Sequence, residues 1–238
     1  MVVQFPRRVL PLTAAIGLLL GLAVACHHAP PAPQLPAGWH ELQAGATPFV
    51  ALYRLHCCGR SNLAATVRAD GERLALVVAA PPGGALAEVW LAADGGWLHR
   101  AGKDCRERLP VGELPLSDGA RLPLDARFAW FLLGGLLPEE ARPVADAPGW
   151  VESRERGGWY RARVAGEPPR LERVLVGRLA AETPLLVAEL GKHRGHLPGW
   201  LALEAGAARA ELALVEWRVA RGLAPPSWLT LPECRETP

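Results

Sequence analysis

The sequence has 238 residues, enough for one large or two small domains. Its 26 basic and 24 acidic residues leave a formal charge of +2, with no basic stripe of the kind that nucleic-acid-binding proteins carry. Nine tryptophans stand against four phenylalanines and two tyrosines. This excess favours amphipathic surfaces or a lined cavity, although high-GC codon bias produces the same excess.

The first 25 residues have the pattern of a bacterial signal peptide. Arg7 and Arg8 form a basic start, and the apolar run from Val9 to Ala25 carries no charge. This run is short for a membrane-spanning helix and typical of a signal-peptide core. Small residues then precede Cys26, as in a lipobox, which predicts cleavage before Cys26 and acylation of that cysteine. An ordinary cleaved signal or an uncleaved anchor is the alternative.

Residues 26–38 are predicted to be a tether. The stretch from Ala29 to Gly38 holds four prolines and no charge, which is typical of an extended linker. Each buried methylene of an acyl chain adds about 0.8 kcal/mol, so several chains hold a protein at a bilayer for long times. We therefore expect a folded domain at 39–220 beside a membrane surface, followed by a C-terminal extension at 221–238.

Short alternating runs separated by turn signals follow the tether. Pro81-Pro82-Gly83-Gly84 predicts a loop, because neither proline can donate to a strand ladder. Ala93-Asp94-Gly95 predicts a hairpin turn. The segment from Trp39 to Val50 is short and broken by Gly45 and Pro48, which leaves little room for a long helix. The strands predicted in this half are 53–60, 62–68, 73–80, 86–92 and 96–100.

A helix is predicted from Leu124 to Leu137. Asp125 is a suitable N-cap, and Gly134-Gly135 can end the helix. The segment is apolar nearly all round, so it must pack against a large hydrophobic surface. Strands resume at 150–156, 158–164, 170–179, 200–205 and 209–219. A second, short helix is predicted from Thr183 to Lys192, because threonine followed by proline suits a helix start.

These elements predict an α+β fold. Closely spaced hairpins make a parallel sheet with crossover helices improbable. A long twisted sheet curls and must cover its inner face, and one apolar helix is a natural cover. We therefore expect an antiparallel curled sheet that forms an open half β-barrel of about 9–11 strands with a helical lid.

Four cysteines remain in the mature chain, namely Cys57, Cys58, Cys105 and Cys234. An exported protein folds in an oxidising compartment, where one or two disulfides are expected. Cys57 and Cys58 are adjacent on a predicted strand and face opposite sides, so a bond between them would be strained. We expect one of them to pair with Cys105 and the other with Cys234, with buried thiols as the alternative.

No convincing catalytic or metal-binding set is present in the sequence. Ser153 and Ser227 lack the G-x-S-x-G elbow of a serine hydrolase. The glycine pairs lack the spacing of a phosphate loop. His27 and His28 beside Cys26, and His193 with His196, lack the spaced ligands of a closed metal site. We therefore expect no enzyme activity, no cofactor and no metal.

Several segments carry a resemblance to a known family. They are the lipobox at Cys26, the strand–loop–strand from Arg73 to Leu91, the helix from Arg121 to Pro138, and the closing strands from Leu197 to Ala220. Together they resemble the LolB group of outer-membrane lipoprotein-localisation proteins, within the LolA/LolB-like fold. The resemblance implies a lipid-anchored monomer on the periplasmic face of the outer membrane. It further implies that the protein receives acylated lipoproteins or phospholipid from a periplasmic LolA-like carrier.

The resemblance also implies a hydrophobic cavity for acyl chains and a protruding loop that delivers them to the membrane. The loop corresponds to Pro81, Pro82, Gly83 and Gly84, with Pro82 where the family carries an exposed leucine. The alternative for each cavity residue is plain core packing, and the alternative function is a non-catalytic envelope assembly lipoprotein that binds a protein partner. The residues expected to line the cavity are Leu76, Val78, Val89, Leu91, Trp130, Phe131 and Trp217.

Overall fold

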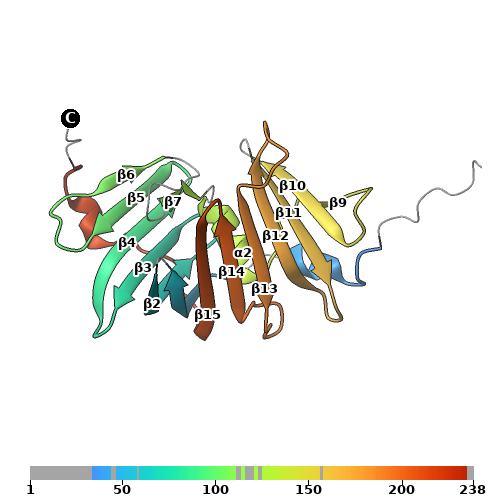
Figure 1. Cartoon of the computed structure of the whole chain (residues 1–238), viewed down its shortest axis with the longest axis horizontal. Coiled ribbons are helices and arrows are strands. Elements are labelled where there is room, and N and C mark those ends of the chain that lie inside the picture. Colours follow the sequence, from blue (N-terminus) through green and yellow to red (C-terminus); the bar gives the residue numbers. More distant parts are fainter. Residues whose placement is uncertain are drawn as a thin grey trace, which may run out of the picture.

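A computed structural model describes residues 34–43, 47–57, 59–110, 114–115, 121–122, 125–155 and 158–234. Its main feature is one antiparallel sheet of thirteen strands that curls around the one α-helix found among these residues (Figure 1). The predicted antiparallel, curled sheet with one covering helix is confirmed, although the sheet has more strands than the 9–11 expected. The signal segment, Cys26 and Cys58 lie outside the described residues.

The sheet consists of two meanders that meet in its middle. The strand order is β6-β5-β4-β3-β2-β1-β15-β14-β13-β12-β11-β10-β9, so the first and last strands are neighbours at the centre. The first meander contains β1 (Phe49–Cys57), β2 (Arg60–Ala69), β3 (Leu74–Ala80), β4 (Gly84–Ala92), β5 (Gly95–Arg100) and β6 (Glu107–Leu109). The second contains β9 (Arg142–Pro143), β10 (Trp150–Glu155), β11 (Gly158–Ala165), β12 (Arg170–Arg178), β13 (Leu186–Gly191), β14 (Trp200–Ala205) and β15 (Ala208–Val219).

Two 3-10 helices and one small sheet lie outside the two meanders. The 3-10 helix η1 (Trp39–Gln43) precedes β1, and the 3-10 helix η3 (Ser227–Thr230) follows β15. Strands β7 (Leu114–Pro115) and β8 (Arg121–Leu122) form a separate two-stranded sheet.

Register shifts bend the sheet into a half-barrel. The pairing slips between Leu52 and Tyr53 in β1, between Val78 and Ala79 in β3, and between Arg163 and Val164 in β11. An extra residue in one strand of a pair kinks that strand and increases the local twist. A sheet of thirteen twisted strands therefore curls and encloses a concave face.

Helix α2 (Ala126–Gly134) covers the concave face because of the chain topology. The chain must travel from β6 at one edge of the sheet to β9 at the other, and α2 lies on that path (Figure 1). The helix is shorter than the predicted Leu124–Leu137, but its predicted capping residues are confirmed. The Asp125 side chain accepts a hydrogen bond from the Phe128 amide at 2.8 Å, and Gly135 adopts a φ of 65°. The Leu136 amide then donates to the Phe131 carbonyl at 2.8 Å, which closes the last turn.

The Asp125 cap gives a first testable prediction. Asp125→Ala should lower the free energy of unfolding by about 1 kcal/mol, because the Phe128 amide loses its side-chain acceptor. Asp125→Ser should lower it less, since serine is also a good N-cap. Urea denaturation of the three proteins checks this ranking, and equal stability of the alanine and serine variants would contradict it.

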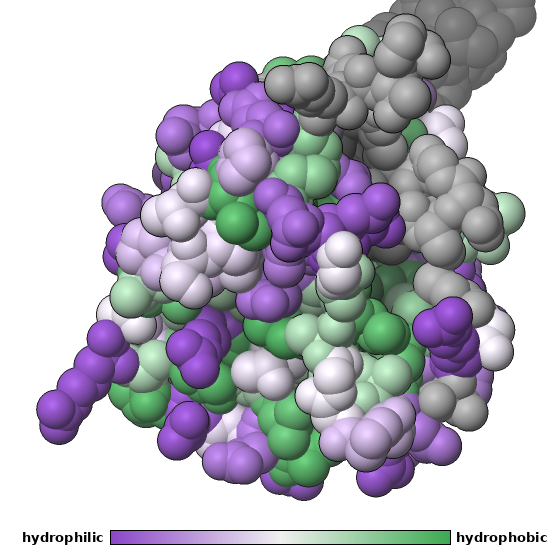
Figure 2. Space-filling view, turned by 90° about the vertical axis from the view of Figure 1, so that its left-hand side faces the viewer, coloured by the Kyte–Doolittle hydropathy of each residue, from purple (hydrophilic) through white to green (hydrophobic). Residues whose placement is uncertain are grey.

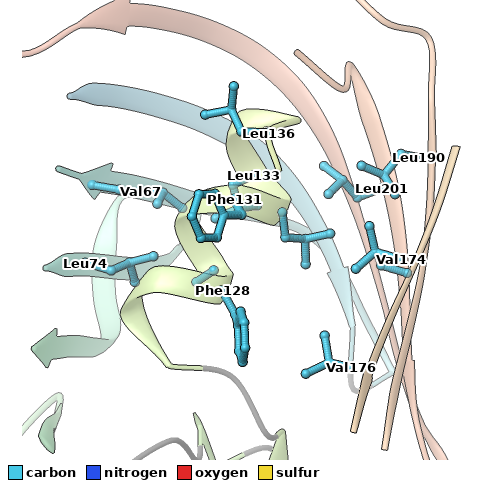
Figure 3. Packing of buried hydrophobic residues seen from close by; sticks show 14 of the residues in the cluster. Val67, Leu74, Phe128, Phe131, Leu133, Leu136, Val174, Val176, Leu190 and Leu201 are labelled. Carbon is cyan, nitrogen blue, oxygen red and sulfur yellow. The ribbon is translucent and has the colours of Figure 1, made fainter. Parts of the chain in front are cut away.

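The main core lies between α2 and the concave faces of both meanders (Figure 3). Phe128 stacks on Tyr160 with ring centroids 5.6 Å apart, and Phe131 lies 6.4 Å from the same ring. In the close-up, side chains from the second meander point toward the helix from one side and those of β2 and β3 from the other (Figure 3). The labelled core residues are Val67, Leu74, Phe128, Phe131, Leu133, Leu136, Val174, Val176, Leu190 and Leu201.

The predicted helix from Thr183 to Lys192 is wrong. Residues Leu186–Gly191 form strand β13, which pairs with β12 and β14. Leu186, Ala188 and Leu190 are buried while Glu189 between them is exposed, which is the two-residue period of a strand. The threonine–proline pair favours the start of a helix, but hydrogen bonding to β12 and β14 holds this segment as a strand.

The N-terminal and edge strands also differ from the prediction. Strand β1 begins at Phe49, four residues before the predicted start at Tyr53, and η1 takes up the segment before it. Strands β6 and β9 have three and two residues, too few to leave a periodic pattern in the sequence.

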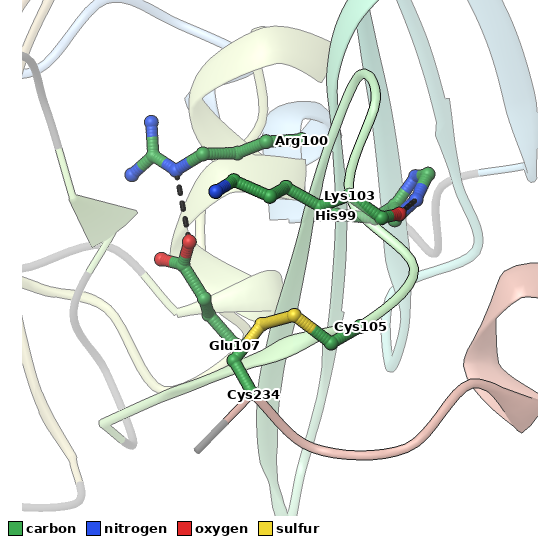
Figure 4. The surroundings of a disulfide bond; sticks show 6 residues. All are labelled: His99, Arg100, Lys103, Cys105, Glu107 and Cys234. Carbon is green, nitrogen blue, oxygen red and sulfur yellow. Dashed lines mark hydrogen bonds and ion pairs between the residues drawn. A yellow bond between two sulfur atoms is a disulfide. The ribbon is translucent and has the colours of Figure 1, made fainter. Parts of the chain in front are cut away.

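The predicted cysteine pairing is also wrong. The structure joins Cys105 to Cys234, with Cα atoms 4.9 Å apart (Figure 4). Cys57 ends β1 in the middle of the sheet, while Cys105 precedes β6 at the edge. Five strand spacings separate β1 from β6, about 24 Å in all, which far exceeds the reach of a disulfide.

Candidate lipid-binding face and cavity

The concave face of the first meander brings four of the predicted residues together. Leu76 and Val78 lie two residues apart on β3, and Val89 and Leu91 lie two apart on β4, so each pair faces the same side. Leu76 is directly opposite Val89 in the register. Val89 and Leu91 are 7% and 4% exposed, whereas Leu76 and Val78 are half-buried. Val89 and Leu91 are therefore core residues, whereas Leu76 and Val78 are open to a ligand.

The open apolar surface continues along β3 and β4 and across the centre of the sheet. Its members are half-buried apolar residues packed against the core. Figure 2 views the molecule from the side of the first meander, where hydrophobic surface gathers in the lower half of the view. In addition to Leu76 and Val78, the surface includes Ala80, Leu86 and Ala87 on β3 and β4, Cys57 on β1, Leu203 on β14 and Ala210 on β15.

The two predicted aromatic residues of α2 have different surroundings. Phe131 is 4% exposed and belongs to the core. Trp130 is half-buried beside the β2–β3 turn, where a Cβ built on Gly71 would lie 3.3 Å from the indole. The Trp130 Nε1 group is buried and has no hydrogen-bond partner. Phe131 thus holds the helix on the sheet, and Trp130 lies at the margin of the concave face.

A cavity of about 360 Å³ opens at the end of the concave face where β1 begins. Its volume lies within the range of small-molecule sites. Of the seven residues predicted to line a cavity, Trp217 lies in its wall. Six elements form the wall: η1, the start of β1, the end of α2, the β11–β12 turn, the β13–β14 connection and β15. The residues that line it are Gly38, Glu41, Leu42, Thr47, Phe49, Gly134, Leu136, Pro168, Pro169, Gly195, His196, Leu197 and Trp217.

Trp217 joins this cavity to the sheet. It stands opposite Ala51 in the β1–β15 register, and its ring centroid is 6.4 Å from that of Phe49. Its Nε1 group is buried without a hydrogen-bond partner. Most of the wall is apolar, while Glu41 and His196 add polar groups. Such a wall suits an apolar chain that carries a polar end.

Sequence reasoning missed most of this wall because loops supply it. Trp217 was found because β15 alternates, but Pro168, His196 and Leu197 belong to connections that have no hydrophobic period. Their proximity to Trp217 results from the strand order, which places β11 to β15 side by side. No local signal in the sequence identifies them.

Two histidines of the β13–β14 connection have lowered pKa values. Partial burial lowers the pKa of His196, which lies in the cavity wall with much of its surface exposed. Burial is also the main cause that lowers the pKa of His193, and its Nε2 lies 2.8 Å from the Leu171 carbonyl oxygen. Both rings are therefore favoured in their neutral form in the folded protein.

These histidines predict that acid destabilises the protein. Each of these histidines has a folded-state pKa below the ordinary value of 6.5. As the pH falls through 6.5, the unfolded chain therefore binds more protons than the folded chain. The free energy of unfolding should therefore decrease from pH 7 to pH 5.5. Urea midpoints at the two pH values measure this loss, and the His193→Gln/His196→Gln variant should show a smaller one. An equal loss in the variant would assign the pH dependence to other groups.

The predicted delivery loop is an exposed turn between β3 and β4. Pro81, Pro82 and Gly83 form the turn, and the Gly83 amide donates to the Ala80 carbonyl at 2.7 Å. Gly83 has a φ of 119°, a conformation that favours glycine, and Gly84 begins β4. The turn is accessible to a membrane or partner, and its role in delivery stays a prediction.

Neither a metal cluster nor a membrane-spanning helix is present in the described part of the chain. No group of three or more histidine, cysteine, aspartate or glutamate side chains there is placed to hold a metal ion. Among the same residues, no helix has the length and apolar character needed to cross a membrane.

Neither a family model nor a curated protein matches the sequence. Several solved structures resemble the chain, and two of them are described here. One is a putative outer membrane lipoprotein-sorting protein domain from Vibrio parahaemolyticus, with a TM-score of 0.51, 10% identity, and coverage of 80% of this chain and 92% of that chain. The other is a LolA superfamily protein from Nitrosomonas europaea, with a TM-score of 0.51, 10% identity, and coverage of 80% and 96%. At this identity the likeness concerns architecture alone, and the chain therefore has a LolA/LolB-like fold.

Proposed function

We propose that this protein is a non-catalytic, lipid-anchored carrier of the LolB type. It binds acyl chains of lipoproteins or lipids on its concave face and helps to insert them in the outer membrane. The observation that carries the proposal is the half-buried apolar surface of the concave face, with a cavity of about 360 Å³ at its end. Acyl chains require a surface of this kind, because each methylene removed from water gains about 0.8 kcal/mol. The LolA-like fold supports the same assignment.

The anchor and the route are part of the proposal. Acylation of Cys26 would hold the domain beside the periplasmic face of the outer membrane, with the proline-rich tether between them. Cargo would arrive from a periplasmic LolA-like carrier. Transfer without ATP requires only that the receiving protein binds the chain more tightly, and about 1.4 kcal/mol gives a tenfold preference.

Photo-crosslinking tests the proposal on the full-length protein in membranes. A phospholipid whose acyl chain carries a diazirine should label peptides of β3, β4 and β15. Val78→Lys should abolish the label on β3, because it places a charge on the apolar concave surface. Val77→Lys is the matched control, since Val77 faces the opposite side of β3 across from Glu88. Labelling confined to the tether would refute the proposal.

A further inference from the structure

The C-terminal extension packs on the outer face of the first meander. Beyond β15 the chain passes through η3, which lies beside β4 to β6 (Figure 1). Trp90, Leu223 and Trp228 form a second buried cluster, separate from the main core. Ala75, Trp97, Leu229 and Leu231 pack around it. We call residues 221–234 the strap.

Polar contacts fix the strap to the strands beneath it. Trp228 Nε1 donates to Glu88 Oε2 at 2.9 Å, and the Trp228 ring stacks on His99 with centroids 5.5 Å apart. The Arg106 guanidinium donates to the Leu229 carbonyl and lies 3.9 Å from the Trp97 ring centroid. The strap is therefore held by specific contacts to β4, β5 and the residue before β6.

The end of the strap also pairs with the backbone at the sheet edge. The Arg106 amide donates to the Pro232 carbonyl at 2.9 Å, and the Cys234 amide donates to the Arg106 carbonyl at 2.9 Å. The Cys105–Cys234 disulfide joins the same two segments, near the ion pair of Arg100 with Glu107 (Figure 4). Both cysteine residues are half-buried at the sheet edge and do not belong to the buried core.

The strap contacts the back of the strands that carry the open apolar surface. Successive residues of a strand point to opposite faces, so Ala75 and Trp90 contact the strap while Leu76 and Val89 face the concave side. The shape of this arm of the sheet is thus set from both faces. Strand β6 is the last strand of the described sheet on this side, and the strap pairs beside it at Arg106.

We propose that the strap is a brace that fixes the shape of the β3–β6 arm, and that the disulfide is its releasable fastening. A dithiol reductant donates two electrons and two protons to the S–S bond, so that two cysteine thiols form and the dithiol becomes a disulfide. The strap is then held only by its non-covalent contacts and opens more often. The arm loosens with it, and acyl affinity falls, a consequence that rests on the proposed function.

Hydrogen exchange measures the brace directly. In the full-length protein held in amphipol, reduction should increase amide exchange in β3, β4 and β5 by about tenfold or more, with little change in β12 and β13. The Cys105→Ser/Cys234→Ser variant should exchange like the reduced protein and should not respond to reductant, which separates this bond from the other cysteines. Trp228→Ala, with the disulfide intact, should give an intermediate increase. Unchanged exchange in β3 to β5 on reduction would overturn the proposal.

A fluorescent sixteen-carbon fatty acid, titrated into the same samples, measures the consequence for binding. Its Kd should rise about fivefold or more on reduction of the wild-type protein and remain constant on addition of reductant to the double variant. Faster exchange with an unchanged Kd would overturn the link between strap and site while leaving the carrier function intact. Failure of the oxidised protein to bind the probe would instead refute the carrier function. The hydrogen-exchange measurement alone would then test whether the strap acts as a brace.

Discussion

Replacing Gly135 by alanine should lower the free energy of unfolding by about 2–5 kcal/mol, since two costs add. Gly135 has a φ of 65°, a left-handed conformation that alanine adopts at a cost of about 1 kcal/mol. A Cβ at this position would also lie 2.0 Å from the His196 carbonyl oxygen, a backbone atom that cannot move alone. The substitution therefore forces apart the end of α2 and the β13–β14 connection.

Alanine variants of two other glycines allow the conformational cost and the steric cost to be measured separately. Gly206 has a φ of 59° and open space around it, so Gly206→Ala should cost only the conformational part. Gly134 is helical, and a Cβ there would approach Leu136 Cδ1 at 2.9 Å, the far end of a flexible side chain. Urea denaturation of the three variants should rank Gly135→Ala as much the most damaging. Equal losses at Gly135 and Gly206 would contradict the close packing at the cavity wall.

Phe131→Ala should cost about 3–5 kcal/mol. The ring is 4% exposed and packs against Tyr160 between the two meanders, so its loss leaves a cavity in the main core. Trp130→Ala is the matched comparison on the same helix. Trp130 is half-buried at the margin of the concave face, so its loss should cost clearly less stability.

Substitutions at Phe131 and Trp130 also distinguish a core residue from a residue of the binding surface. Thermal or urea unfolding should place Phe131→Ala far below Trp130→Ala in stability. In the fatty-acid titration, Trp130→Ala should weaken binding, while the folded fraction of Phe131→Leu should retain it. Equal stability losses at the two positions would show that our division of α2 between core and site is incorrect.

Much of the fold was predictable because its strands alternate strongly. The segment from Leu74 to Leu91, the Asp125 cap and the glycine stop at Gly135 follow from local pattern and capping chemistry, and the structure has them. Strand β13 was mistaken for a helix because its short sequence fits both patterns, and only its neighbours β12 and β14 decide. The Cys105–Cys234 bond depends on where the extension folds back, which no local pattern specifies.

The candidate site was predictable in part for the same reason. Alternation places Leu76, Val78 and Trp217 on the inward face, and the structure leaves these residues half-buried. Alternation gives no information on depth, so Val89 and Leu91 were grouped with them although they are closed core. His196 and Leu197 also line the cavity, but their positions depend on the β13–β14 connection, which alternation does not predict.

Native mass spectrometry of the full-length protein, extracted gently from its own membranes, tests the central claim most directly. We predict additional mass on the protein that corresponds to a phospholipid or an acylated peptide, and loss of that mass in Val78→Lys but not in Val77→Lys. A wild-type protein with no bound acyl ligand, apart from any lipid attached at Cys26 as proposed, would contradict the account.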